Sequence, residues 1–506
     1  MAVLTHRYSR RHVLRVAAVA PVGAAVLTAC GGAGTATSGS TTGAAPVAVT
    51  SSAPAKAVTT ATTAAKATSA TAASAGAAKP TPTPQAGDSR KGAATTVRLS
   101  YGWGGTSVLP TWDTISKQFG DAFPSFNVQW VVGDNNTKLV ATIAAGTPPD
   151  AAVGNAPYPE FWAKGAATAL DSMIAASKVI NKKDIPTAAW DYASYKGKVY
   201  GVPAVEAFVR YSLCMDMTNL QKYSIDPKTL SWDWDTVVQL QQQLTTKTAS
   251  GDIAILGIDP QDCAAGGLSG GNPFYWGHAY DIEYFDPTTG KFNFDNDQLV
   301  EAMTMIKRLH DVAGGVQAVK KFQASTGFWN GNPKAMLPSG MEAMAVNIYT
   351  APGVLAHDAP SRSFAYTWAP VPTSHKGWKV QATGGHNAFI PSGAKYAAQG
   401  FQVIEHLVGD LAEQTIYDNI GWLGARTSFL AKVNAGKYPG LDFFIQSVKQ
   451  NDKLFGMPAN PIENQTATLW NTALQSVLTA KATPKDALAQ LQQVVTAQMS
   501  QQFPNG

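Results

Sequence analysis

The 506-residue sequence has little cysteine, little charge and no long apolar run. It holds three cysteines, none at the CxxC spacing that marks zinc sites, and its histidines are scattered singly, so we expect neither a metal nor a cofactor. Charged residues make up 14% of the chain, and glycine and alanine are abundant, which suits a globular protein. The uncharged stretch 16–29 is shorter than the ~20 residues of a membrane-spanning helix.

Charge is unevenly distributed along the chain. The formal net charge is +5, but the first 29 residues carry four arginines and no acidic residue, and residues 30–96 carry five basic residues against Asp88 alone. Residues 97–506 are therefore left with a net charge of −3. A mildly acidic body argues against nucleic-acid binding, which requires a basic surface.

Aromatic residues are missing from residues 31–96, where alanine, threonine, serine and glycine dominate. A segment without aromatic residues has little to build a packed core from, so we expect residues 30–96 to form a flexible tether. All thirteen tryptophans lie at Trp103 or beyond, and we expect the folded domain to span 97–506.

The N-terminal part contains the stretch RRHVLRVAAVAPVGAAVLTACGG. Arg10 and Arg11, followed by an apolar run without acidic residues, are typical of a twin-arginine export signal, which we place at residues 1–29. The sequence LTAC resembles a bacterial lipobox, in which the signal is cut before the cysteine, and this implies that Cys30 carries the lipid. We therefore expect an exported protein that is lipid-anchored to the cell membrane on its extracellular or periplasmic face.

The folded domain retains two cysteines, Cys214 and Cys263. They could form a disulfide in an oxidising compartment, or both could be buried thiols, and their spacing does not decide between the two.

Strand and helix patterns alternate at the start of the folded domain. Alternating apolar residues predict strands in VRLSYGW, FNVQWVV and PDAAVGN, and apolar residues at helical spacing predict helices between them. The order β-α-β-α-β predicts an α/β domain with a largely parallel sheet, in which ligands bind beyond the carboxyl ends of the strands. The loops at those ends are 102–107, 133–136 and 154–158.

Two later helices have clear sequence signals. The stretch DQLVEAMTMIKRLHDV places Met303, Ile306 and Leu309 on one helical face. In ATPKDALAQLQQVVTAQM, Thr483 is the predicted N-cap and Pro484 the first helical residue.

Several colinear stretches resemble the extracellular solute-binding proteins of bacterial ABC importers, in particular the sugar-binding family that includes maltodextrin-binding proteins. These stretches are KLVATIAAGTPPDAAVGNAPYPEFWAKGAATALD, YKGKVYGVPAVEAFVRYSL, GMEAMAVNIYTAPG, FAYTWAPVPT and TGGHNAFIPSGAKYAAQGFQVIEHLVGDLAEQTIYDNIGWLGARTS. The resemblance covers essentially all of residues 97–500. It departs at YSLCMDMTNLQKY, where the family usually has a Tyr-Asn-Lys-type strand end.

The resemblance implies an α/β, two-lobed periplasmic-binding-protein-like fold of type II, in which crossover segments join the lobes and serve as a hinge. The order of the matches places lobe 1 at about 97–205 and 346–388, and lobe 2 at about 208–344 and 390–506. It also implies a receptor, not an enzyme, that captures a sugar or oligosaccharide between the lobes and delivers it to the permease subunits of an ABC transporter. Lobe closure would remove water and let both lobes bind the ligand.

A sugar site requires aromatic plates for the C–H faces of the sugar and polar groups for its hydroxyls. On this basis and on the resemblance, we expect fourteen ligand-binding residues. They are Trp103, Gly104, Asn155, Tyr158, Glu206, Asn272, Tyr275, Trp276, Tyr349, Gly385, His386, Trp422, Arg426 and Trp470.

Some of these residues have a second interpretation. Glu206 could be a solvated hinge charge, His386 a structural histidine and Trp470 a core residue. For Phe274, in the run GGNPFYWGH, a core position is the better interpretation.

Two other functions fit an exported protein with many aromatic residues. The first is binding of a non-sugar solute, such as a polyamine or a glycerol phosphate, because aromatic plates and a carboxylate also suit a polyamine. The second is a carbohydrate-active enzyme, which would use two carboxylates roughly 5–10 Å apart. We find no nucleophile, metal or phosphate-loop motif that supports an enzyme.

Overall fold

The computed structural model describes residues 87–88, 95–102, 108–132, 136–154, 156, 158–261, 273–326 and 335–504. Residues 84–506 form one compact unit. The predicted export signal, lipidated Cys30 and most of the predicted tether lie outside the described residues. Within the described ranges, none of the helices combines the length and the apolar character needed to cross a bilayer.

The first of two large sheets contains the predicted β-α-β-α-β order. Its strands lie in the spatial order β1 (Gly87–Asp88), β3 (Asn127–Val132), β2 (Thr96–Tyr101), β4 (Ala151–Val153), β16 (Asn387–Phe389) and β7 (Gly201–Pro203). Strand β2 pairs in parallel with β3 and β4, and Tyr101 is opposite both Val132 and Val153. The carboxyl ends of these three strands therefore meet at one edge, as the sequence predicted.

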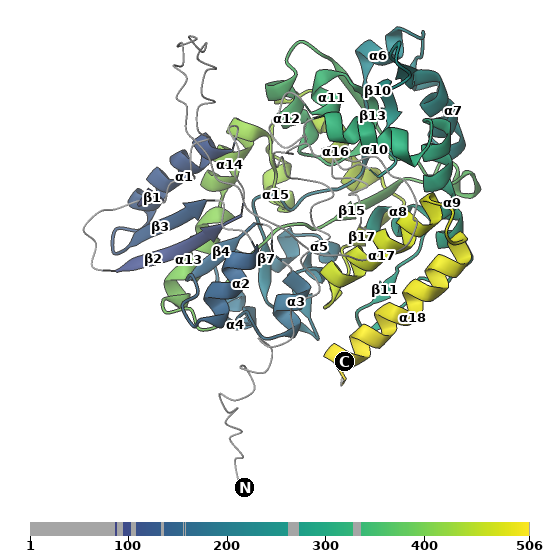
Figure 1. Cartoon of the computed structure of the whole chain (residues 1–506). Coiled ribbons are helices and arrows are strands. Elements are labelled where there is room, and N and C mark those ends of the chain that lie inside the picture. The colour runs from purple at the N-terminus through teal and green to yellow at the C-terminus, as the bar shows by residue number, and fades with distance from the viewer. Residues whose placement is uncertain are drawn as a thin grey trace, which may run out of the picture. The chain divides into compact units, whose positions relative to one another are not determined.

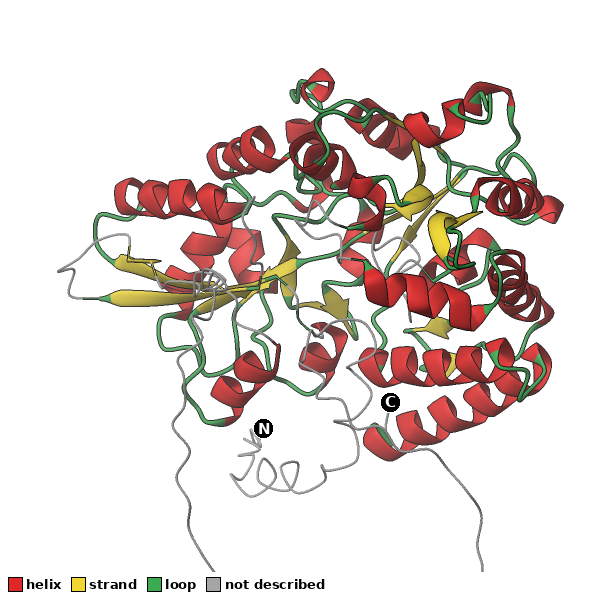
Figure 2. Cartoon of the chain, turned by 45° about the horizontal axis from the view of Figure 1, so that its top comes forward, coloured by secondary structure: helices red, strands yellow, loops and turns green. Residues whose placement is uncertain are grey.

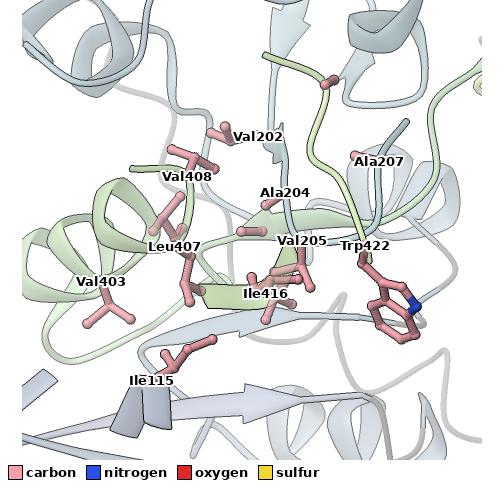
Figure 3. Packing of buried hydrophobic residues seen from close by; sticks show 14 of the residues in the cluster. Ile115, Val202, Ala204, Val205, Ala207, Val403, Leu407, Val408, Ile416 and Trp422 are labelled. Atoms are coloured by element: carbon pink, nitrogen blue, oxygen red, sulfur yellow. The ribbon is translucent and has the colours of Figure 1, made fainter. Parts of the chain in front are cut away.

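Helices cover this sheet (Figure 1). Helix α1 (Leu109–Ala122) packs on β3 and on α14 (Asp410–Ile420), and α13 (Ala397–Leu407) packs on β2 and β4. Figure 3 shows part of the shared core, in which Ile115 and Leu407 lie near Ile416.

The second large sheet has the order β14 (Phe364–Thr367), β8 (Ser212–Asp216), β13 (Glu342–Asn347), β10 (Ile253–Ile258) and β9 (Thr246–Lys247). Helices α7 (Trp234–Leu244), α9 (Asp297–Val312), α17 (Glu463–Leu478) and α18 (Pro484–Gln502) share a second hydrophobic core with it. Figure 2 shows strands surrounded by helices in both parts of the domain.

Shorter elements complete the described fold. They are α2 (Asn136–Ala144), α3 (Tyr158–Ala163), α4 (Asp171–Ala176), α5 (Thr187–Asp191), β5 (Ser194–Tyr195), β6 (Lys198–Val199), α6 (Met217–Gln221), α8 (Phe274–Ala279), β11 (Phe285–Asp286), β12 (Lys291–Phe292), α10 (Val316–Ser325), α11 (Met336–Ser339), α12 (Ala351–Asp358), β15 (Val380–Thr383), α15 (Thr427–Leu430), α16 (Leu441–Gln450) and β17 (Lys453–Gly456).

Within the described residues, the chain crosses between the two parts of the domain at three places. Residues 204–211 connect β7 to β8, and residues 384–386 connect β15 to β16. The third crossing is the segment 421–452 between α14 and β17, in which α16 packs on Tyr366 of β14 and on Trp368. Strands β15 and β17 pair in parallel as a small separate sheet.

The observed pairing differs from the predicted lobe boundaries in two places. Strand β14 lies within 346–388, which we assigned to lobe 1, yet it pairs with β8 of the second sheet. Helix α13 lies within 390–506, which we assigned to lobe 2, yet it packs on the first sheet. The chain returns to the first sheet at 384–386, not near 345, because β13 stays paired with β8 and β10.

Two helices agree with their sequence signals. Helix α9 spans the predicted stretch and buries Met303, Ile306 and Leu309. Helix α18 begins after Thr483, whose side chain accepts a hydrogen bond from the Asp486 backbone N–H.

Candidate functional site

The first candidate region is the edge where β2, β3 and β4 end together. The loops that follow these strands contain the predicted ligand residues Trp103, Gly104 and Asn155, which lie outside the described residues, as does Asn272. Tyr158 begins α3, just beyond the end of β4. Its ring is 1% exposed and stacks on Trp162 with ring centroids 5.6 Å apart, and its hydroxyl donates to the Gly154 carbonyl.

Two crossovers are paired through their backbones near this edge. The Ala204 N–H donates to the His386 carbonyl at 3.1 Å, and the His386 N–H donates to the Glu206 carbonyl at 2.9 Å. Further along, the Arg210 N–H donates to the Ala382 carbonyl at 2.9 Å. The crossovers therefore form one hydrogen-bonded unit between the two sheets.

A strained turn precedes Glu206 in the first crossover. Val205 has φ +66°, and the Glu206 N–H donates to the Ala204 carbonyl at 2.8 Å across it. This is a γ-turn with positive φ, the rarer and more strained of the two γ-turn forms. A β-branched residue adopts such a conformation only where surrounding contacts hold it.

The carboxylate of Glu206 is buried at this turn, 5% exposed, between two basic side chains. Its Oε1 lies 3.3 Å from Arg210 Nη1, and its Oε2 lies 2.6 Å from His386 Nδ1. Burial raises the pKa of Glu206, but His386 and Arg210 together lower it by more, so the net pKa lies below its ordinary value. The structure thus brings together Glu206, Gly385 and His386, which we predicted from separate segments.

Tyr349 lies beside the same crossover. Its ring is fully buried and packs edge-on against Phe208 with ring centroids 5.5 Å apart, and its hydroxyl donates to the Leu423 carbonyl at 2.8 Å. Burial raises the pKa of Tyr349 well above its ordinary value. Trp422, next to Leu423, lies in the core of the first sheet (Figure 3).

Three predicted aromatic plates lie in the core of the second sheet. The Tyr275 hydroxyl donates to the Pro370 carbonyl. Trp276 stacks on Trp234 with ring centroids 4.7 Å apart, and Trp470 packs on Phe294 with ring centroids 5.9 Å apart. Each of the three side chains is at most 2% exposed, as are Tyr158 and Tyr349. Phe274 is in the core, as predicted.

Arg426 also has a structural position. Its guanidinium forms ion pairs with Asp184, Asp410 and Glu413 at 3.3, 2.7 and 3.1 Å. These contacts join α14 and α15 to the segment around Asp184, so the guanidinium is already engaged by carboxylates of the protein.

Two residues at the junction of the two parts of the domain were not expected from the sequence. The first is Arg210, which carries the charge that faces Glu206, and its signal was one basic residue in the apolar stretch AVEAFVR. The second is Tyr192, whose hydroxyl donates to Glu463 Oε2 of α17 at 2.6 Å. Beside this contact, a cavity of about 370 Å³ is lined by the β5–β6 hairpin and by residues of β11, α18 and the segment before α17.

The described part of the chain contains no group of three or more His, Cys, Asp or Glu side chains that could hold a metal ion. Cys214 is buried in β8 next to Tyr366. Cys263 lies outside the described residues, so the question of a disulfide stays open.

Solved structures with the same fold are numerous. The protein CpMnBP1 with bound mannotriose is 20% identical, has a TM-score of 0.68 and covers 79% of this chain and 99% of its own. An ABC-transporter solute-binding protein from Thermotoga lettingae with bound α-D-tagatose is 18% identical, with a TM-score of 0.65 and coverages of 80% and 100%. The maltose/maltodextrin-binding domain MalE of Bdellovibrio bacteriovorus, bound to maltotriose, is 15% identical, with a TM-score of 0.62 and coverages of 81% and 100%.

These similarities show that the chain has the two-lobed periplasmic-binding-protein-like α/β fold that the sequence predicted. No curated protein matches the chain. Residues 114–444 match the family model described as bacterial extracellular solute-binding protein. With its fold, its paired crossovers and this match over more than half of its length, the chain belongs to the bacterial extracellular solute-binding proteins.

Proposed function

We propose that this protein is a lipid-anchored receptor that captures a sugar or oligosaccharide between its two lobes and delivers it to the permease of an ABC importer. The observation that carries this proposal is the family match over residues 114–444, which assigns the chain to solute binders. The ligands of the similar structures, which are mannotriose, α-D-tagatose and maltotriose, support a carbohydrate as the solute.

The geometry of the crossovers supports capture by lobe closure. Of the crossovers in the described residues, two are hydrogen-bonded to each other, so the lobes can rotate about a narrow, ordered connection. The ends of β2, β3 and β4, with Tyr158 beyond them, lie on one lobe beside this connection. A ligand that touches both lobes would favour the closed arrangement by its extra contacts there.

The membrane anchor is part of the proposal and rests on residues 1–30. A twin-arginine signal followed by LTAC supports export and lipid attachment at Cys30, and the aromatic-free residues 31–96 support a tether. Such an anchor would keep the receptor near the permease while leaving it free to collect solute.

The charge around Glu206 favours a neutral ligand over a polyamine. A polyamine site would need carboxylates available to the cation, whereas both oxygens of Glu206 face basic side chains of the protein. The family is one of binding proteins, and we propose that the chain has no enzymatic activity of its own.

A thermal-shift screen tests the proposal. The panel contains mannotriose, maltotriose, tagatose, spermidine and glycerol 3-phosphate, because a ligand that binds only the native state raises the melting temperature by mass action. We expect a shift with at least one carbohydrate, recovered unaltered, and an affinity near micromolar, or about 8 kcal/mol. A shift with spermidine or glycerol phosphate alone, or cleavage of the sugar, would contradict it.

A further inference from the structure

Arg210 connects the two paired crossovers through its side chain. Its Nη1 donates to Glu206 Oε1 at 3.3 Å within the first crossover, and its Nε donates to the Gly384 carbonyl of the second at 3.0 Å. The side chain is 18% exposed, so most of the guanidinium is removed from water. One planar group therefore satisfies a carboxylate and a carbonyl from two segments that are far apart in the sequence.

The backbone of the second crossover is shaped to receive this guanidinium. Gly385 has φ +152°, and a Cβ atom there would lie 2.6 Å from Arg210 Nη2 and 2.8 Å from the Glu206 carbonyl oxygen. Only a residue without a side chain leaves room for this approach. The glycine and the arginine thus form one fitted contact.

The strained turn at Val205 depends on the same contacts. Glu206 follows the turn and is held by its backbone carbonyl, which accepts from His386 N–H, and by its two carboxylate oxygens. Without Arg210, the buried carboxylate would lose one of its two basic neighbours, and the turn would lose one of the contacts that hold it.

We propose that Arg210 is a positioning residue of the ligand site: it holds Glu206 and the second crossover in register, so that the hinge moves as one unit and the site takes a neutral polyhydroxylated ligand. The carboxylate has acceptor sites beyond the two that Arg210 and His386 occupy, which suits a ligand hydroxyl, while its charge is compensated. The choice of ligand class rests on the proposed function, whereas the positioning role does not.

Hydrogen exchange of the unliganded full chain tests the positioning role directly. In Arg210→Met, we expect exchange in peptides covering 204–211 and 380–387 to be about tenfold faster or more, because the amide bonds between the crossovers open more often. Arg210→Lys keeps the charge but not the planar guanidinium, so its exchange rates should lie between those of the wild type and those of Arg210→Met. If Arg210→Met does not fold, the lysine variant alone must show faster exchange in the same peptides.

The matched control is Arg362→Met. Arg362 also pairs with a buried carboxylate, Asp216, and is 21% exposed, but the pair lies in the second sheet and away from the crossovers. We expect this variant to melt at a lower temperature with unchanged exchange in 204–211 and 380–387. Faster crossover exchange in both variants would mean that general destabilisation, not positioning, is the cause, and would overturn the proposal.

Calorimetric titrations with mannotriose, maltotriose and spermidine test the ligand class. We expect Arg210→Met and Glu206→Gln each to weaken carbohydrate binding about tenfold or more. The double variant should bind carbohydrate no more weakly than the weaker-binding single variant, because Arg210 acts through Glu206. If the double variant shows the summed loss of affinity of the two single variants, Arg210 does not act through Glu206. Binding of spermidine by the wild type would overturn the proposed ligand class. Exchange effects without any carbohydrate binding would refute the proposed function while leaving the positioning role intact.

Discussion

At the scale of single residues, close approach of backbones governs the site. The two crossovers come together because Gly385 leaves space that no other residue would leave, and the buried charges meet within that space. Substitutions here should therefore act through geometry more than through loss of side-chain contacts.

Gly385→Ala should lower the free energy of unfolding by roughly 2–4 kcal/mol, because its Cβ would collide with Arg210 and with the backbone of Glu206. The control is Gly377→Ala, since Gly377 has φ +85° but a Cβ atom added there would meet no other atom within 4 Å. That variant should lose only about 1 kcal/mol from backbone strain. Urea denaturation measures both, and equal losses would show that the crossovers tolerate a wider spacing.

The residues of the site were partly predictable from sequence. Glu206, Gly385 and His386 came from segments whose order resembles a known family. In the structure His386 pairs with the Glu206 carboxylate, and Gly385 lies close to the Glu206 backbone. Tyr275 and Trp470 were not separable from core residues, because an aromatic side chain that stacks on a ligand and one that fills a core have the same local sequence pattern.

At the scale of elements, helices marked by local sequence signals could be predicted, whereas the pairing of strands that are distant in the sequence could not. Helices α9 and α18 follow from periodicity and capping residues, which act over a few positions. The lobe boundaries depended on which sheet each strand joins, and short strands such as β14 and β15 carry no local mark of their partner. Pairing between distant segments is the information that a single sequence does not display.

Thr483→Ala should lower the free energy of unfolding by about 1 kcal/mol, because the Thr483 hydroxyl oxygen caps α18 by accepting from the Asp486 N–H at 3.1 Å. Thr468→Ala serves as the control, since its hydroxyl is exposed, donates to the Asn464 carbonyl within α17 and caps no helix end. The control should be neutral or slightly stabilising. Equal destabilisation of both variants in thermal denaturation would argue against the cap.

At the scale of the whole molecule, the Tyr192–Glu463 hydrogen bond joins the first sheet's part of the domain to α17. Burial raises the pKa of Glu463 to about 7, and the hydrogen bond from Tyr192 offsets only part of this effect. The folded protein therefore binds the Glu463 proton more tightly than the unfolded chain, whose glutamate pKa is about 4.3. This contribution to stability is complete below the unfolded pKa and is lost as the pH rises through about 7.

Glu463→Gln should remove this pH dependence, because the amide carbonyl still accepts from Tyr192 but carries no proton to lose. Relative to the wild type, the variant should become progressively more stable between about pH 5 and 8. Tyr192→Phe keeps the buried carboxyl and should keep the wild-type trend. Chemical denaturation at several pH values measures the difference, and parallel curves for wild type and Glu463→Gln would contradict the assignment.

The proposed function requires the two lobes to close around a carbohydrate. The most direct measurement is small-angle X-ray scattering of the full chain, alone and saturated with the carbohydrate that gives the largest melting shift. We predict a smaller radius of gyration in the saturated sample, because closure of the lobes makes the domain more compact. An unchanged radius of gyration at full occupancy would show that the ligand binds without closure of the lobes, and would contradict the proposed function.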